Sequence, residues 1–101
     1  MTFDTGATVT TISSEILSRL GYDIASGKVQ KITTGSGVAH LREIIVDKLM
    51  LGKLELKDVK VYAHDFPDEC FTTGVIGLNV LSQFDILLSF SKKIISLAKI
   101  D

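Results

Sequence analysis

The sequence has 101 residues, a formal net charge of −1 and a hydrophobic fraction of 46%. This length favours a single domain over residues 1–101 without a linker. Eleven Lys and Arg residues against twelve Asp and Glu leave no basic tract for binding phosphates, which argues against nucleic-acid binding. No apolar run approaches the roughly 20 residues that would span a bilayer, so the apolar excess favours a buried subunit interface instead.

Cysteine and histidine content points away from disulfides and metals. The one cysteine, Cys70, cannot form an internal disulfide, and we expect a loop thiol in a reducing compartment. No secretory segment follows Met1, so we expect a cytoplasmic protein. His40 and His64 lie in predicted strands without His or Cys at metal-ligand spacing, which favours surface or interface roles over zinc. We therefore expect neither metal nor cofactor.

The first part of the chain predicts a turn, a short extended segment and a helix. Asp4-Thr5-Gly6 is typical of a turn, and the β-branched residues from Val9 to Ile12 favour an extended chain. Ser13 is a suitable N-cap for a helix over Ser14–Leu20, and Gly21 is suited to the position after its end.

The rest of the chain is predicted to be mainly β. Strands over Lys28–Thr34 and Val38–Leu51 flank a glycine-rich hairpin tip, and Leu54–His64 follows a turn at Gly52-Lys53. Residues 65–73 are predicted to form a loop that leads into a short strand at Val75-Ile76. Asn79 is predicted to cap a short helix that carries Val80, Leu81 and Phe84, before a final hairpin of Ile86–Phe90 and Ile94–Ile100. This pattern predicts an all-β, mainly antiparallel barrel or sandwich with two short helices.

Three motifs stand in an informative order. Asp4-Thr5-Gly6-Ala7-Thr8 comes first, a glycine-bearing hairpin starting at Thr33 lies about thirty residues on, and Val75-Ile76-Gly77-Leu78 lies about seventy residues on. In this order and spacing the chain resembles the retropepsin-like aspartic proteases, the single-lobed relatives of pepsin, and most closely their bacterial and retrotransposon DTGA branch. The resemblance covers nearly the whole chain and implies a small closed β-barrel.

The resemblance also implies roles for individual residues. Asp4 would be the catalytic carboxylate and Gly6 would bring its backbone N–H to it. Thr5 would bond the corresponding loop of a second copy, and Thr8 would hydrogen-bond an outer oxygen of Asp4, with Ala7 completing the active-site loop. Val75, Ile76, Gly77 and Leu78 would support that loop. The flap over the substrate would comprise Thr33, Thr34, Gly35, Ser36, Gly37, Val38 and Ala39.

Such chemistry requires two carboxylates, and the chain supplies one. No other Asp is followed by Thr-Gly, and the length excludes an internal duplication. The second carboxylate would come from a second copy across a two-fold axis. Two carboxyls this close share one proton, so that one activates a water molecule while the other donates to the scissile carbonyl. We therefore expect a homodimeric aspartic endopeptidase acting on a peptide or protein substrate.

Alternatives remain for the motifs. The Asp4 segment also fits a surface turn that never meets a substrate, and Gly35-Ser36-Gly37 also fits an ordinary hairpin tip. The second functional class is a non-catalytic module of the same fold that serves dimerisation or peptide binding. The family normally has one or two strands before the motif, where this chain has only Met1-Thr2-Phe3. We therefore expect the functional protein to extend further toward its N-terminus, and the chain as numbered to be folded but weakly active or inactive.

Overall fold

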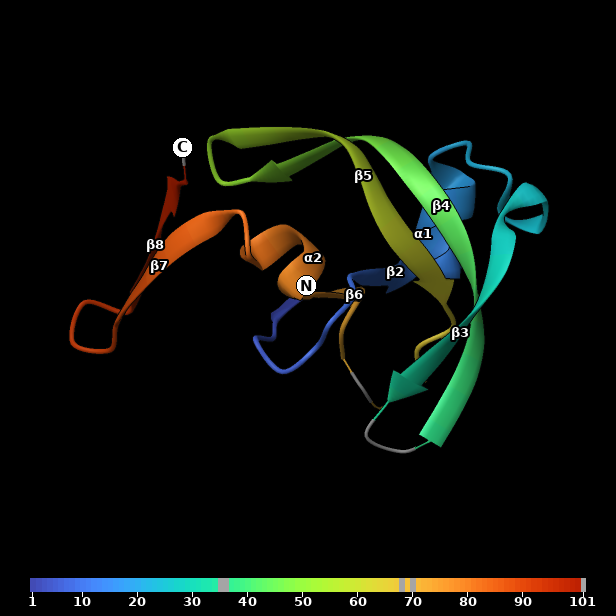
Figure 1. Ribbon diagram of the computed structural model, residues 1–101, viewed down its shortest axis with the longest axis horizontal. Coiled ribbons are helices and arrows are strands. Elements are labelled where there is room, and N and C mark those ends of the chain that lie inside the picture. Colours follow the sequence, from blue (N-terminus) through green and yellow to red (C-terminus); the bar gives the residue numbers. More distant parts are fainter. Residues whose placement is uncertain (35–36, 68, 70, 101) are drawn as a thin grey trace.

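The computed structural model describes residues 1–34, 37–67, 69 and 71–100 (Figure 1). Within these residues the chain forms a sequence of short and long strands with helical segments between them. The elements are β1 (Thr2–Phe3), β2 (Thr11–Ser13), α1 (Ser14–Arg19), the 3-10 helix η1 (Ile24–Ser26), β3 (Lys28–Thr34), β4 (Gly37–Leu51), β5 (Leu54–His64), β6 (Gly74–Ile76), α2 (Leu78–Leu81), β7 (Phe84–Ser89) and β8 (Ile94–Lys99).

Six of these strands form one curled sheet in the order β1-β6-β2-β5-β4-β3. The β1–β6 and β2–β5 pairs are parallel, and the other pairs of this sheet are antiparallel. The remaining strands, β7 and β8, form a separate antiparallel hairpin that extends away from the sheet (Figure 1). The predicted all-β, mainly antiparallel architecture with two short α-helices is confirmed.

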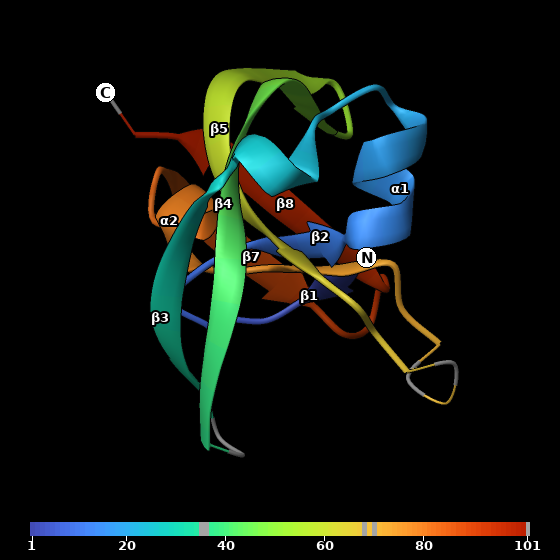
Figure 2. The same ribbon diagram turned by 90° about the vertical axis from the view of Figure 1, so that its right-hand side faces the viewer.

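The curled sheet is a half-barrel and not the closed barrel that we expected. Its order leaves β1 and β3 as the two edges, and closure would need hydrogen bonds between them. The two residues of β1 already pair in parallel with Val75 and Ile76 of β6. The long β3–β4 hairpin instead extends beyond the body of the domain (Figure 2).

Local sequence signals account for several element boundaries, although α1, β2, β6, β7 and β8 differ from their predicted bounds by one or two residues at one end or both. The bounds of β3 and β5 are those predicted, and β4 begins one residue earlier than predicted, at Gly37. Gly21, with φ of +96°, ends α1 as expected: its N–H donates to the Ser18 carbonyl, and the Tyr22 N–H donates to the Leu17 carbonyl. These two bonds form a Schellman motif, which favours glycine at this position.

Ser13 occupies the predicted N-cap position of α1, although its side chain makes no capping hydrogen bond. The prediction for the second helix is wrong. The second helix begins at Leu78 with Gly77 at its N-cap, so that Asn79 lies inside the helix and Phe84 belongs to β7. The side chain of Asn79 is engaged elsewhere, as described below.

The core lies between the curled sheet and the two helices. Leu17 of α1, Val61 of β5 and Val80 of α2 are fully buried within one apolar cluster. No helix within the described residues is both long and apolar enough to cross a membrane.

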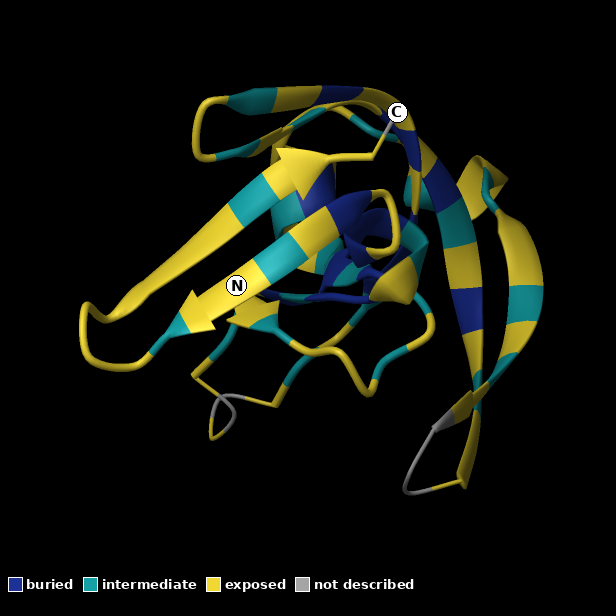
Figure 3. Ribbon diagram, turned by 60° about the vertical axis from the view of Figure 1, so that its left-hand side comes forward, coloured by how far each residue is buried: buried dark blue, intermediate teal, exposed yellow. Residues whose placement is uncertain are grey.

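One apolar strip leads out of this core along the β7–β8 hairpin. Phe84 is 5% exposed, and Ile86 and its register partner Leu97 are partly buried against the core. Two residues further toward the hairpin tip, Leu88 is 50% exposed and its partner Ile95 is 48% exposed. Successive residues of one strand face alternate sides, so Phe84, Ile86 and Leu88 share one face. This strip therefore continues from the core into solvent, where the outer part of the hairpin is uncovered (Figure 3).

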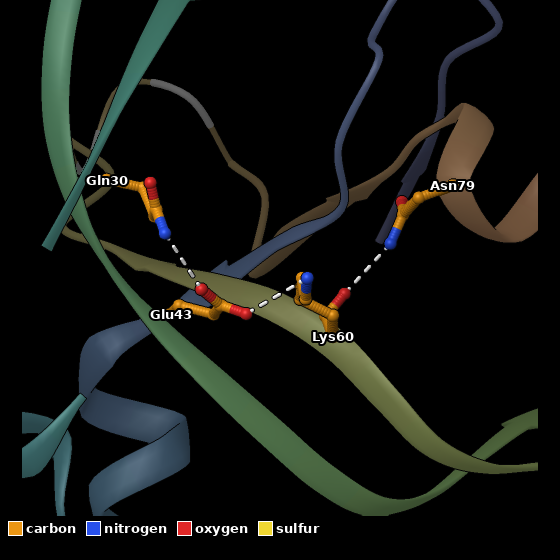
Figure 4. A network of polar contacts seen from close by, with 4 residues as sticks. All are labelled: Gln30, Glu43, Lys60 and Asn79. Atoms are coloured by element: carbon orange, nitrogen blue, oxygen red, sulfur yellow. Dashed lines mark hydrogen bonds and ion pairs between the residues drawn. The ribbon is translucent and has the colours of Figure 1, made fainter. Parts of the chain in front are cut away.

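A polar network crosses the face of the sheet that lies opposite the core (Figure 4). The Gln30 Nε2 on β3 donates to Glu43 Oε2 on β4 at 3.2 Å, and Lys60 Nζ on β5 lies 3.1 Å from Glu43 Oε1. Hydrogen bonds from Lys60 and then from Gln30 lower the pKa of the Glu43 carboxyl below its ordinary 4.5. The same pairing raises the pKa of Lys60 above its ordinary 10.5.

This network predicts a pH-dependent contribution to stability. Because the pKa of Glu43 is lowered in the folded chain, its contribution is complete above pH 4.5 and is lost as the pH falls through the folded value. The contribution of Lys60 is complete below pH 10.5 and is lost as the pH rises through its raised folded value. Urea unfolding of Glu43→Gln should therefore show a smaller loss of stability than wild type between about pH 5 and pH 3. Asp85→Asn, at an exposed carboxyl on β7, should leave the wild-type pH dependence in place; equal slopes for wild type and Glu43→Gln would contradict the prediction.

Candidate active site

Asp4 sits in a tight turn directly after β1. Its N–H donates to the Ile76 carbonyl at 3.1 Å, which extends the pairing of β1 with β6 by one bond. The Gly6 N–H donates to Asp4 Oδ1 at 2.8 Å, and the Ala7 N–H donates to the Asp4 carbonyl at 3.2 Å. The carboxyl side chain is exposed and is held from its own backbone. The contact between Gly6 and the carboxylate is the one implied by the sequence resemblance.

The turn is fastened to the start of α2 by backbone hydrogen bonds. The Leu78 N–H donates to the Ala7 carbonyl at 2.7 Å, and the Asn79 N–H donates to the Thr8 carbonyl at 3.2 Å. These bonds satisfy helix N–H groups that have no partner within the helix. A Cβ at Gly77 would lie 2.2 Å from the Val9 carbonyl oxygen and 2.8 Å from that of Ala7, so only glycine allows this approach.

A fully buried hydroxyl locks the same junction. Thr10 is 0% exposed, and its Oγ1 donates to Asn79 Oδ1 at 2.7 Å and accepts the Gly77 N–H at 3.0 Å. The Thr10 carbonyl accepts the Tyr62 N–H at 2.9 Å, while Asn79 Nδ2 donates to the Lys60 carbonyl at 2.8 Å (Figure 4). Thr10 and Asn79 thus tie the segment after Asp4 both to α2 and to β5. Neither role was predicted from the sequence.

Asp4 lines a cleft of about 360 Å³. The turn supplies one side, the β3–β4 hairpin supplies another, and β2, β6 and the end of β5 supply the rest. Ile32 and Ala39, which are register partners on the hairpin, both face this space. The lining residues are Asp4, Gly6, Ala7, Thr8, Val9, Thr11, Ile32, Thr33, Ala39, Leu41, His64, Phe66 and Val75.

The structure brings the predicted loop and the predicted flap to one cleft. Of the predicted flap, Thr33 and Ala39 line it, Val38 is 54% exposed outside it, and Gly35 and Ser36 lie outside the described residues. Thr34 and Gly37 are the facing ends of β3 and β4, and Gly37 is not among the described residues that line the cleft. Of the predicted supporting residues, Val75 lines the cleft and Ile76 is buried in the core.

Two predicted contacts of the loop are not made within the described part of the chain. The contact of Thr8 with Asp4 is not formed, and the contact of Thr5 would need a second copy. Thr8 lines the cleft, but no hydrogen bond joins its hydroxyl to Asp4 within the described part of the chain. Its carbonyl is instead bonded to Asn79, and that bond fixes the direction of the loop. Thr5 is exposed beside Asp4 and does not line the cleft.

His64 and Phe66 were not predicted to belong to the site, and both line the cleft. Their rings meet edge to face, with centroids 4.7 Å apart and an interplanar angle of 89°. Val61 and Ala63 of β5 belong to the core cluster. Because successive side chains of a strand face alternate sides, Tyr62 and His64 lie on the opposite face of β5. In the sequence, only the alternation along this strand could have indicated that His64 faces away from the core. The loop after β5 brings Phe66 back to the same cleft.

A larger cavity of about 600 Å³ lies elsewhere, between β5, α2 and β8. It is lined mainly by charged and amide side chains such as Lys57, Lys60, Gln83 and Lys99, and contains none of the Asp4 turn. We assign the candidate active site to the smaller cleft because it joins the turn, the hairpin and the apolar lining.

Comparison with known proteins identifies the family of this chain. The family model described as aspartyl protease matches residues 1–80, and the chain belongs to that family. A crystal structure of a retropepsin-like aspartic protease from Rickettsia conorii has the same fold, with a TM-score of 0.68 and 24% sequence identity over 94% of this chain and 69% of that one. No curated protein sequence gives a significant match.

The buried Thr10 hydroxyl yields a stability prediction. Thr10→Val keeps the shape of the side chain but leaves the Gly77 N–H and Asn79 Oδ1 without this partner. An unsatisfied buried polar group costs about 1–3 kcal/mol, so we expect the free energy of unfolding to fall by about that amount in urea titration. Thr2→Val is the matched control, because the Thr2 hydroxyl contacts Thr72 at an exposed position. Equal stability of the two variants would show that the Thr10 hydroxyl does not hold the junction.

Proposed function

We propose that the chain is an aspartic endopeptidase that works as a homodimer. The observation that carries this proposal is the position of Asp4, exposed at a cleft that also contains the β3–β4 hairpin, with its carboxylate held by the Gly6 N–H. Membership of the aspartyl protease family supports the same activity.

The need for a second copy follows from the number of carboxylates. Asp4 is the one acidic residue among those that line the cleft in the described part of the chain. Two Asp4 side chains facing each other across a two-fold axis would share a proton. The ionised carboxylate takes a proton from a water molecule whose oxygen attacks the scissile carbonyl carbon, and the protonated carboxyl donates its proton to the carbonyl oxygen. Collapse of the resulting tetrahedral species breaks the C–N bond as the amine takes the proton that the first carboxylate removed from water, and a hydroxyl proton of the tetrahedral species returns to the second carboxylate.

The exposed strip of the β7–β8 hairpin supports a dimer. Leu88 and its register partner Ile95 continue the core face into solvent, and Phe90, at the turn of the same hairpin, is 88% exposed. Contiguous apolar surface of this kind marks interaction sites in soluble proteins. A second copy would remove this surface from water.

The activity test centres on Asp4. With casein or a mixed peptide library as substrate, Asp4→Asn should lower turnover by at least about 100-fold, because the variant can neither accept nor donate the shared proton. Asp23→Asn, at an exposed aspartate outside the cleft, is the matched control and should keep wild-type turnover.

The pH profile of the same assay separates this mechanism from others. Wild-type turnover should be highest at acid to mildly acid pH and fall on both sides, because both the fully protonated and the fully ionised dyad are inactive. Chelators should leave it unchanged. Undiminished turnover in Asp4→Asn, or inhibition by a chelator, would contradict the proposal.

The oligomeric state is a separate prediction. Sedimentation at micromolar concentration should give twice the mass of the 11.0 kDa chain. Leu88→Asp should shift the equilibrium toward the monomer, because it places a charge in the apolar strip, whereas Ser96→Asp on the opposite face of the hairpin should shift it less. A monomer across this concentration range would contradict the shared dyad. A stable dimer that cleaves no peptide would instead favour the second candidate, a dimeric peptide-binding module.

A further inference from the structure

His64 lines the cleft, and the proposed mechanism gives it no role. It ends β5, is half-buried, and lines the same space as Asp4. Its ring meets the edge of Phe66 at 4.7 Å, and within the described residues neither ring nitrogen has a hydrogen-bond partner. The aromatic contact fixes the orientation of the imidazole, and its nitrogens remain available to a ligand.

The other walls of the cleft do not offer a cation. The lining residues from the hairpin, β2 and β6 are aliphatic side chains or threonines, and no Lys or Arg is among the described lining residues. An imidazole is the side chain that gains a positive charge in the acid range, where a shared aspartate dyad is also expected to work. His64 is therefore the residue of this cleft that can balance a negative substrate group.

The charged groups near this end of β5 do not occupy His64, so it can pair with a negative substrate group. On β4, the Arg42 Nη1 donates to the Gly27 carbonyl, and Glu43 is bonded to Gln30 and Lys60. Asp65, next in the chain, is exposed outside the cleft lining. Of the titratable groups described here, only Asp4 and His64 line the cleft itself. A substrate carboxylate would be repelled by the negative dyad unless His64 paired with it.

We propose that His64, oriented by Phe66, forms a specificity subsite that selects peptide substrates with a carboxylate side chain at the position facing the end of β5. This inference rests on the proposed function, since it names the substrate class of the same cleft. A charge-assisted hydrogen bond in a half-enclosed site is worth about a tenfold preference in kcat/KM.

The test compares matched peptides that differ by Glu, Gln or Leu at one position, scanned through the residues on both sides of the cleaved bond. At one position, wild type at about pH 5 should cleave the Glu peptide about tenfold faster than the Gln peptide, measured as kcat/KM. In His64→Gln this ratio should fall to one or below, because the uncompensated dyad then repels the carboxylate. Circular dichroism would show that the variant is folded.

The matched control is His40→Gln, an exposed histidine on β4 that does not line the cleft, which should keep the wild-type Glu preference. Cleavage of all peptides without a Glu preference at any position would overturn the inference and leave the proposed function standing. Failure to cleave any peptide would overturn the proposed function. In that case the same Glu and Gln pairs in a fluorescence binding assay would decide the inference, because equal Kd values for wild type and His64→Gln would overturn it.

Discussion

The buried hydroxyl of Thr10 is the interaction on which the candidate site depends. It accepts the Gly77 N–H and donates to Asn79, so one oxygen atom joins the segment after Asp4 to the start of α2. The backbone bonds from Leu78 and Asn79 to the loop carbonyls run in the same direction and close the junction. Because Thr10 is 0% exposed, solvent cannot replace these hydrogen bonds, and losing the hydroxyl is costly. The position of Asp4 is therefore set by polar contacts that lie beneath the cleft, and not by the cleft itself.

β5 carries this arrangement across the rest of the domain. Tyr62 bonds the Thr10 carbonyl, and the Lys60 carbonyl accepts from Asn79 while its ammonium pairs with Glu43 (Figure 4). Through Glu43 the network reaches Gln30 on β3, the outer strand of the hairpin that covers the cleft. His64 ends the same strand inside the cleft. One strand thus positions the hairpin, the Asp4 loop and the histidine relative to one another.

The sequence predicted what depends on neighbouring residues and missed what depends on distant ones. The bounds of β3 and β5 followed from β-rich runs between turn and loop residues, and Gly21 followed from the backbone conformation that a helix end requires. The role of Asn79 was wrong because its side chain is used by Thr10, 69 residues away, and a capping rule considers only its own helix. Thr10 was part of a β-branched run, and its sequence neighbours give no sign that its hydroxyl is buried. The position of His64 was readable from alternation along β5, but the ring contact with Phe66 depends on the path of the following loop. The catalytic role of Asp4 stays a prediction.

The pairing of Thr10 with Gly77 and Asn79 also bears on the order in which the protein folds. These contacts join residues 67 and 69 positions apart, and the β1–β6 pairing beside Asp4 spans a similar distance. Contacts of high sequence separation carry a larger loop-closure cost than local hairpins such as β4–β5, so we expect them to form later. During synthesis the Asp4 turn therefore lacks its anchors until α2 has left the ribosome. A candidate site assembled in this order stays incomplete while its own chain is still unfolded, which is when that chain is most easily cut.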